Sequence, residues 1–201
     1  TATLVLLGFA ITVAASFPIG IATAKRAGGK LDRAITVFNQ VCMSIPPVFV
    51  GILLCFVFGI TLRVFVPGRF VTFGEDPGGF LLYMLFPALA VALSRIAMTV
   101  KMLRSSILDE MEKDYIRTAF SRGWTRVDAL KKHALRNAII PVIAFLGVTA
   151  AELVAGSIVV EQVFAVPGLG QLLLSSIGSR DFPVAQAVVI LLATWVVVVN
   201  F

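Results

Sequence analysis

The segment from Tyr115 to Asn137 reads YIRTAFSRGWTRVDALKKHALRN, and it is the one long charged segment in an otherwise apolar chain. Of the 201 residues, 59% are hydrophobic, and several apolar runs reach the length of roughly 20 residues that crosses a bilayer. A soluble domain with a single core of this size would need far more polar surface. The sequence therefore predicts an all-α, multi-pass membrane protein in which this segment joins two apolar helices outside the bilayer.

Five apolar spans are expected, separated by loops rich in charge, glycine or proline. They cover residues 1–24, 34–65, 80–100, 138–160 and 184–201. Pro46-Pro47 is expected to kink the second span after Ser44, and the fourth span is expected to begin around Pro141, since proline is tolerated in a first helical turn. Because the chain begins without Met and stops inside an apolar run, we expect one membrane domain over 1–201 that is incomplete at both ends.

The basic residues predict the orientation of these spans. The formal net charge is +6, and fourteen of the seventeen Lys and Arg residues fall within 25–33 or 95–136. The positive-inside rule therefore predicts that the large loop, residues 101–137, lies in the cytosol. Nucleic-acid binding is not expected, because the basic residues sit in short loops between apolar spans and not on a solvated face.

The cytosolic loop is expected to fold as an amphipathic helix, a corner and a second, shorter helix. Apolar residues recur at every fourth position, the pattern of an amphipathic helix, at Leu103, Ile107, Met111, Tyr115 and Ala119. Gly123 is expected to end that helix, and residues 125–128 (Thr-Arg-Val-Asp) read as a capping box that starts the next one. Such a protruding corner suits entry into a groove on a soluble partner. A solvated loop without a partner is the alternative.

At these residues the chain resembles the permease subunits of bacterial ABC importers, whose cytosolic loop carries Glu-Ala-Ala, three residues, Gly, nine residues and Ile-x-Leu-Pro. Arg117-Thr118-Ala119 stands where Glu-Ala-Ala is expected, Gly123 is in register, and His133–Arg136 keeps only the leucine of the last group. These departures are similar to the peptide and nickel branch of the family, in which Asp-Tyr-Ile-Arg-Thr-Ala precedes the glycine and His-Ala-Leu-Arg-Asn-Ala follows it. This sequence has both, at 114–119 and 133–138.

Further motifs extend the resemblance over nearly the whole chain. They are Ser44-Ile45-Pro46, Phe86–Leu89, Val159–Phe164, Pro167–Gly170 and Asp181-Phe182-Pro183. The last three resemble the B-type subunit, the first of the two permeases in dipeptide and oligopeptide systems. The resemblance implies a helical bundle of the type I importer kind, with five visible transmembrane helices and a cytosolic coupling helix. It also implies import of a peptide or a related small solute, such as a dipeptide, an oligopeptide, a nickel chelate or glutathione.

The resemblance implies a multi-pass protein of the bacterial plasma (inner) membrane that works in a complex. The expected partners are a second homologous permease of the C type, two ATP-binding subunits, an extracellular or periplasmic substrate-binding protein and the lipid bilayer. ATP and Mg are expected in the ATPase subunits, so no catalytic residue, cofactor or metal is expected in this chain. The sequence has no G-x-x-x-x-G-K-[ST] phosphate loop. The residues expected to dock the ATPase are Tyr115, Arg117, Thr118, Ala119, Gly123, Thr125, Asp128, His133, Leu135 and Arg136.

Two further groups of residues are candidates for contact with cargo or with the binding protein. Glu152 lies about 21 Å along its helix from Ala138, and an ionised side chain near the bilayer centre costs on the order of 3 kcal/mol or more. One hypothesis places Glu152 with Ser44 and Pro46 on the translocation pathway, facing a cationic part of the cargo; a hydrogen-bonded glutamate packed against another helix is the alternative. The outer residues Glu161, Pro167, Gly168, Gly170 and Asp181 are expected either to contact the binding protein or to be solvated.

Two other classes of membrane protein fit this sequence less well. An ion-coupled secondary transporter would place paired acids or broken helices near the middle of the membrane, and only Glu152 fits that description. An integral membrane enzyme would need a cluster of titratable or metal-binding side chains at one depth, which the sequence does not contain.

Overall fold

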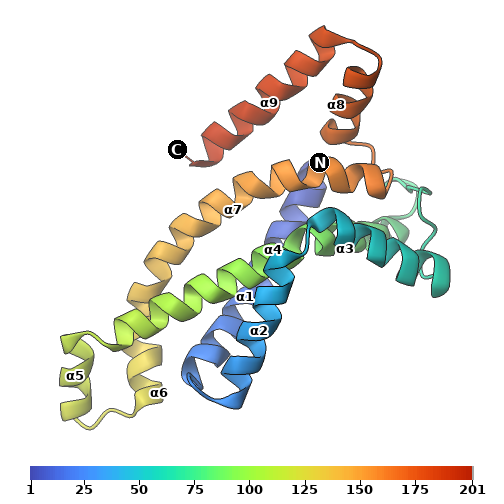
Figure 1. Ribbon diagram of the computed structural model, residues 1–201. Helices are drawn as coiled ribbons and strands as arrows, with labels where there is room; N and C mark the ends of the chain where they lie inside the picture. Colours follow the sequence, from blue (N-terminus) through green and yellow to red (C-terminus); the bar gives the residue numbers. More distant parts are fainter. Residues whose placement is uncertain (201) are drawn as a thin grey trace. The chain divides into compact units, whose positions relative to one another are not determined.

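The computed structural model describes residues 1–200, and every regular element in this range is a helix (Figure 1). In chain order the elements are α1 (Ala2–Lys25), α2 (Lys30–Ser44), α3 (Pro47–Leu54), the π-helix η1 (Cys55–Thr61), α4 (Pro77–Met111), α5 (Asp114–Ser121), α6 (Arg126–Ala129), the π-helix η2 (Leu130–Ala134), α7 (Leu135–Val163), α8 (Leu169–Gly178) and α9 (Phe182–Asn200). Four helical stretches are long and apolar enough to cross a membrane, and a fifth is counted if 30–44 and 47–61 form one broken span. The chain is therefore an all-α, multi-pass membrane protein, as predicted.

Helix boundaries near prolines differ from the expected ones. The second span is broken and not merely kinked, because α2 ends at Ser44 and α3 begins at Pro47, with Pro46 in an extended conformation (φ −62°, ψ 142°). A residue that precedes proline is pushed out of the α region, which explains the break. The expectation that the fourth span begins at Pro141 is wrong, since Pro141 lies within α7. Membrane helices tolerate a single proline when neighbouring groups satisfy the freed carbonyl.

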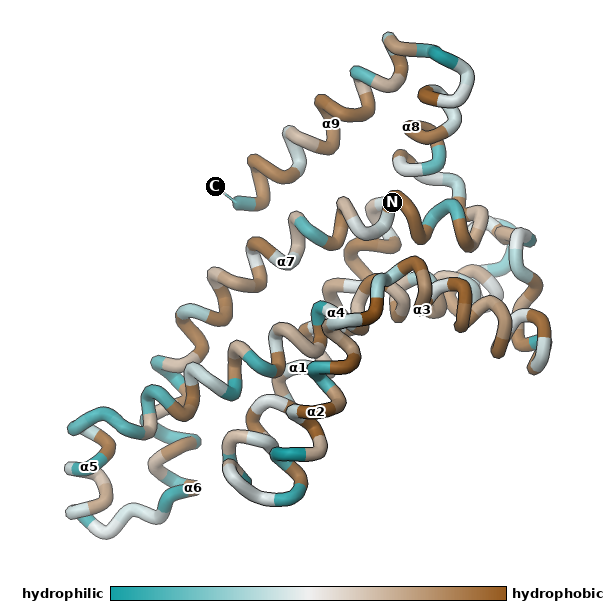
Figure 2. Tube along the Cα trace, in the orientation of Figure 1, coloured by the Kyte–Doolittle hydropathy of each residue, from teal (hydrophilic) through white to brown (hydrophobic). Residues whose placement is uncertain are grey.

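The chain divides into two compact units. The first comprises residues 1–11, 45–93 and 148–201, and the second comprises residues 12–44 and 94–147. Hydrophobic residues line α9 in the first unit, whereas in the second unit hydrophilic residues gather between α4 and α5, and α5 and α6 carry a mixture of hydrophilic and hydrophobic residues (Figure 2). The charged loop therefore belongs wholly to the second unit.

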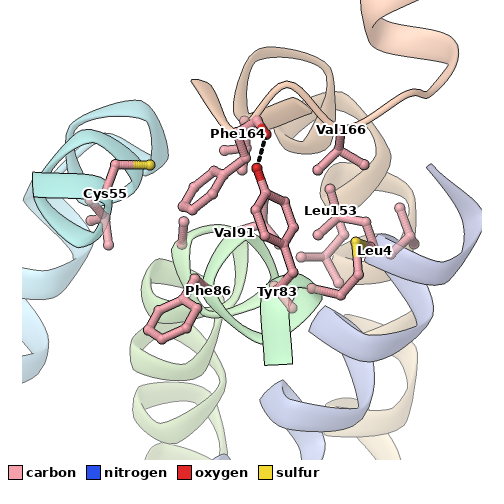
Figure 3. Packing of buried hydrophobic residues seen from close by; sticks show 14 of the residues in the cluster. Leu4, Cys55, Tyr83, Phe86, Val91, Leu153, Phe164 and Val166 are labelled. Atoms are coloured by element: carbon pink, nitrogen blue, oxygen red, sulfur yellow. Dashed lines mark hydrogen bonds between the residues drawn. The ribbon is translucent and has the colours of Figure 1, made fainter. Parts of the chain in front are cut away.

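The core of the first unit is an aromatic and aliphatic cluster (Figure 3). The rings of Phe65 and Phe86 stack with centroids 4.5 Å apart, and Phe65 meets the edge of Tyr83 at 5.4 Å. Leu153 and Phe164 on and after α7 are almost fully buried in the same cluster. Because lipid tails are as apolar as these side chains, close packing and buried polar contacts stabilise the cluster more than the hydrophobic effect does.

Tyr83 supplies such a polar contact. Its hydroxyl donates to the carbonyl oxygen of Phe164 (Figure 3) and accepts from the backbone N–H of Gly68 at 3.1 Å. Replacing Tyr83 with phenylalanine leaves a buried carbonyl unpaired, so we expect a loss of about 1–3 kcal/mol in stability. The measurement is the thermal unfolding midpoint of the purified full-length protein. Tyr115→Phe is the matched control, because the Tyr115 hydroxyl is bonded at the surface; equal midpoints for the two variants would contradict the prediction.

In the second unit an ion pair links α2 to α4. The Arg104 guanidinium binds both carboxylate oxygens of Asp32, with Nε 2.6 Å from Oδ1 and Nη2 2.8 Å from Oδ2. The backbone N–H of Gly28 also donates to Oδ2, at 2.8 Å. Asp32 is only 3% exposed, and a buried carboxylate is tolerated when it is paired and hydrogen-bonded in this way.

Candidate functional site

The charged loop, residues 101–137, contains a helix break that the sequence pattern did not predict. One amphipathic helix through Tyr115 and Ala119 was expected, but α4 ends at Met111 and α5 begins at Asp114. Lys113 between them is extended (φ −71°, ψ 153°). The break falls where four of six consecutive residues, 109–114, are acidic, and like charges at helical spacing destabilise a continuous helix. The expectation of one continuous helix was therefore wrong.

The predicted corner after α5 is confirmed. Gly123 adopts a left-handed conformation (φ 87°), its N–H donates to the carbonyl of Phe120 at 2.9 Å, and the N–H of Trp124 donates to Ala119 at 3.2 Å. These are the two bonds of a Schellman motif, whose left-handed residue is usually glycine. Thr125 then caps α6, because its Oγ1 accepts from the N–H of Asp128 at 3.2 Å. The corner is thus held by its own local bonds.

A groove lies on this corner, with a volume of about 250 Å³. It is lined by Tyr115, Thr118, Ala119, Arg122, Trp124 and His133. The structure thus brings together four of the residues predicted to dock a partner, from α5 and η2. Arg122 and Trp124 were missed by the sequence analysis.

Trp124 organises one wall of the groove. Its ring meets His133 edge to face, with centroids 5.0 Å apart, and Lys132 Nζ lies 4.6 Å from the ring centroid. An ammonium over an indole face is a favourable cation–π contact. The sequence held one signal for this residue, since Trp124 is the sole tryptophan in the charged segment and follows the helix-ending glycine.

Tyr115 fixes the other side of the groove. Its hydroxyl donates to Glu110 at the end of α4 and accepts from Asn137 Nδ2 at 3.2 Å in the first turns of α7. Partial burial and the hydrogen bond to Glu110 raise the pKa of Tyr115, so the hydroxyl remains protonated and able to donate. The two helices that enter and leave the corner are therefore tied together by one side chain.

The other predicted docking residues lie outside the groove. Arg117 is exposed and pairs with Asp114 at 3.3 Å, while Asp128 serves the cap of α6. Leu135 is half-buried at the start of α7, and Arg136 beside it is exposed. Exposed basic side chains continue along the whole segment, at Arg117, Arg122, Arg126, Lys131, Lys132 and Arg136. The surface therefore combines an aromatic groove with a positively charged border, and it offers contacts for a protein partner.

The structure corrects the expectation that Glu161 lies on a solvated outer loop. Glu161 belongs to α7 and is fully buried, because α7 continues to Val163. Its Oε2 accepts from the backbone N–H of Gly170 at 2.8 Å and of Gln171 at 3.3 Å, at the start of α8. A Cβ at Gly170 would come within 2.8 Å of that oxygen, so glycine permits the approach. Glu161 is thus a buried support for α8 and offers no surface to a partner.

The remaining outer residues vary in exposure. Pro167 and Asp181 are exposed, Gly168 is half-buried and Gly170 is buried. Asp181 Oδ1 accepts from the N–H of Val184 at 3.3 Å in the first turn of α9. A helix-capping role therefore accounts for Asp181 without a partner.

The three residues predicted to line a translocation pathway are all exposed. Ser44 ends α2, with its hydroxyl donating to the carbonyl of Gln40 at 2.9 Å, and Pro46 precedes α3. Glu152 lies within α7. Their contact with cargo stays a prediction.

The chain is similar to known membrane transport proteins. The family described as binding-protein-dependent transport system inner membrane component matches residues 16–201. The chain is 36% identical to the oligopeptide transport system permease protein AppB of Bacillus subtilis over 202 residues, covering all of this chain and 64% of AppB. It is 32% identical to the dipeptide transport system permease protein DppB of the same organism over 191 residues, covering 95% of this chain and 59% of DppB.

The chain thus spans less than two thirds of the length of these relatives. The match to the family nevertheless extends from within α1 to the end of α9, and it includes the whole of the corner and groove. The chain belongs to the family of binding-protein-dependent transport system inner membrane components.

Proposed function

We propose that the chain is a permease subunit of an ATP-driven importer of peptides or related small solutes, and that the corner at Gly123 docks an ATP-binding subunit. The observation that carries this proposal is the groove between α5 and η2, built on a locally held corner outside the apolar spans. Family membership supports a role in binding-protein-dependent transport. The names of two relatives, for oligopeptide and dipeptide transport systems, support peptides as the cargo.

The expected complex contains a second permease of the C type, two ATP-binding subunits and a substrate-binding protein outside the inner membrane. ATP and Mg would be bound by the ATP-binding subunits, so this permease would not itself be an enzyme. The concentration of basic residues in the corner supports its placement in the cytosol, where those subunits would reach it.

In this proposal a conformational change drives transport, and the chain performs no covalent chemistry. Closure of the ATPases around ATP would move the docked corner, and α4 and α7, which continue from both sides of it, would pass that motion to the membrane spans. The Tyr115 bonds to Glu110 and Asn137 would make these helices respond together.

Trp124→Ala tests the docking surface. A truncated tryptophan at the centre of an interface costs 2 kcal/mol or more, so we expect the affinity of the ATP-binding subunit for the full-length permease to fall about thirtyfold. Trp195→Ala is the matched control, because it removes the chain's other tryptophan from α9. Binding is measured by titrating the labelled ATP-binding subunit onto permease in nanodiscs. Equal affinities for the two variants would remove Trp124 from the interface.

The proposed function as a whole is tested by purification and uptake. We expect the full-length chain to co-purify in mild detergent with an ATP-binding subunit, and peptide uptake into proteoliposomes to require internal ATP. Recovery of the chain without such a subunit, together with uptake that survives ATP depletion and follows an ion gradient, would instead favour an ion-coupled secondary transporter.

A further inference from the structure

The second compact unit, residues 12–44 and 94–147, contains a cavity that is separate from the groove at the corner. Its volume is about 170 Å³, and residues of α1, α2 and α4 line it. Six of its lining side chains carry hydrogen-bonding or cationic groups, namely Thr23, Thr36, Asn39, Gln40, Lys101 and Arg104. The Thr23 hydroxyl already donates to backbone carbonyls of its own helix, which leaves the other five to recognise a ligand. The cavity lies within one unit, so its lining is defined by that unit alone.

Asn39 contributes a polar group to the wall of this cavity. The residue is 8% exposed, and its amide makes no hydrogen bond to any residue from 1 to 200. Among these residues the one enclosed side-chain atom without a hydrogen bond is Glu161 Oε1, so the Asn39 amide is open to the solvent in the cavity. An amide N–H₂ on the wall of a small cavity is a donor suited to an oxygen of a bound group.

The charge of the cavity identifies the class of ligand. Lys101 is exposed to solvent and forms no ion pair with any described residue. Arg104 uses Nε and Nη2 to hold Asp32, which leaves Nη1 as a donor without a partner among residues 1–200. Asp32 is the acidic group that pairs with Arg104, and Arg104 and Gly28 already satisfy its two oxygens. Lys101 and Arg104 carry two positive charges and Asp32 carries one negative charge, so the net charge at the cavity is positive.

The position of the cavity in the chain narrows the class of candidate ligands further. Lys101 and Arg104 lie on the part of α4 that leads into the charged loop, and Asp32 lies at the turn rich in Lys and Arg. The positive-inside rule assigns both segments to the cytosolic side of the membrane, where anionic lipid headgroups are found. Basic pockets between membrane helices on that side are suited to phosphate groups.

We propose that Asn39, Lys101 and Arg104 form a binding site for a phosphate oxyanion, supplied by the headgroup of an anionic phospholipid or by free phosphate. Arg104 is positioned by Asp32, Lys101 contributes a mobile charge, and the Asn39 amide donates from the buried wall. Thr36 and Gln40 offer further donors along the same face of α2. The site is distinct from the groove at the corner and is independent of the proposed transport function.

The test uses the full-length permease with its partner subunits in nanodiscs. One arm compares discs of phosphatidylcholine with discs containing equal amounts of phosphatidylcholine and phosphatidylglycerol, and native mass spectrometry counts the phosphatidylglycerol molecules retained after release. The other arm adds inorganic phosphate to phosphatidylcholine discs and follows the thermal unfolding midpoint, which rises when a ligand binds the folded state. Lys101→Gln and Asn39→Leu each remove one ligand-binding group. Lys30→Gln is the matched control, since it removes a positive charge from the start of α2 outside the cavity.

Retention of phosphatidylglycerol, or stabilisation by phosphate, supports the site if the apparent affinity falls about tenfold or more in both cavity variants and is kept in the Lys30→Gln protein. The arm that responds identifies the source of the phosphate group. If Asn39→Leu prevents assembly, the result for Lys101→Gln alone decides whether the site exists. Lys101 is exposed, so its replacement is not expected to prevent folding. Responses that are equal in wild type, Lys101→Gln and Lys30→Gln, or no response in either arm, would overturn the proposal.

Discussion

ATP-driven uptake should fall by about fivefold to thirtyfold when Gly123 is replaced by valine. The backbone of Gly123 is left-handed (φ 87°), and this conformation costs a residue with a Cβ about 1–2 kcal/mol, with β-branched side chains among the least tolerant. A penalty of that size lowers the ratio of the native corner to its other conformations by a factor of about 5–30. Since the groove residues lie on both sides of this corner, the proposed docking surface would be lost with it.

The comparison that isolates this cause is Gly123→Asn. Asparagine tolerates the left-handed region far better than valine, so we expect it to retain most of the uptake. No atom lies within 4 Å of a Cβ built at Gly123, so steric crowding does not explain a difference between the two variants. Uptake and ATPase co-purification are measured on the same proteoliposome preparations. If valine and asparagine behave alike, the conformation of the corner is not what docking requires.

The largest loss of stability is expected from Glu161→Ala. Alanine strands the backbone N–H of Gly170, which is buried, and leaves a cavity where the carboxylate had packed. We expect a loss of about 3 kcal/mol or more, equivalent to a fall of roughly 6–12 °C in the unfolding midpoint of a chain of this size. The midpoint is measured by intrinsic fluorescence of the full-length protein in nanodiscs.

Two further variants separate the buried carboxylate from a simple change of charge. Glu161→Gln keeps the shape of the side chain and one accepting oxygen, so its loss should be smaller than that of alanine. Glu75→Gln removes a carboxylate from an exposed loop and should leave the midpoint nearly unchanged. If the Glu161→Ala and Glu75→Gln proteins have the same unfolding midpoint, α8 does not depend on the Glu161 carboxylate.

Composition and periodicity were sufficient for the number and type of the spans. The corner was also predictable, because glycine at a helix end and threonine as an N-cap act through bonds within a few residues, and both are present at Gly123 and Thr125. The family motif around Arg117 and His133 located the segment in the chain. The residues of the motif indicated which surface to consider, but they did not indicate the shape of that surface.

Features that depend on distant or competing contacts were not predictable. The break at Lys113 was hidden because the apolar period of α4 continues into α5, while the acidic residues around it acted against the helix. Glu161 looked like a loop residue because its partners, Gly170 and Gln171, follow nine and ten positions later. Trp124 lines the groove because its ring contacts His133. This contact depends on how α5, the corner and η2 are arranged in space, which the sequence pattern does not show.

The local bonds at Gly123 and Thr125 have a consequence for how such transporters diversify. A surface whose shape is encoded within residues 114–134 does not rely on the sequence of the membrane spans to keep its turn. Its aromatic and basic side chains are then free to vary while the backbone stays the same. Under the proposed docking role, exchange of this one short segment would change the choice of ATPase and leave the membrane spans intact.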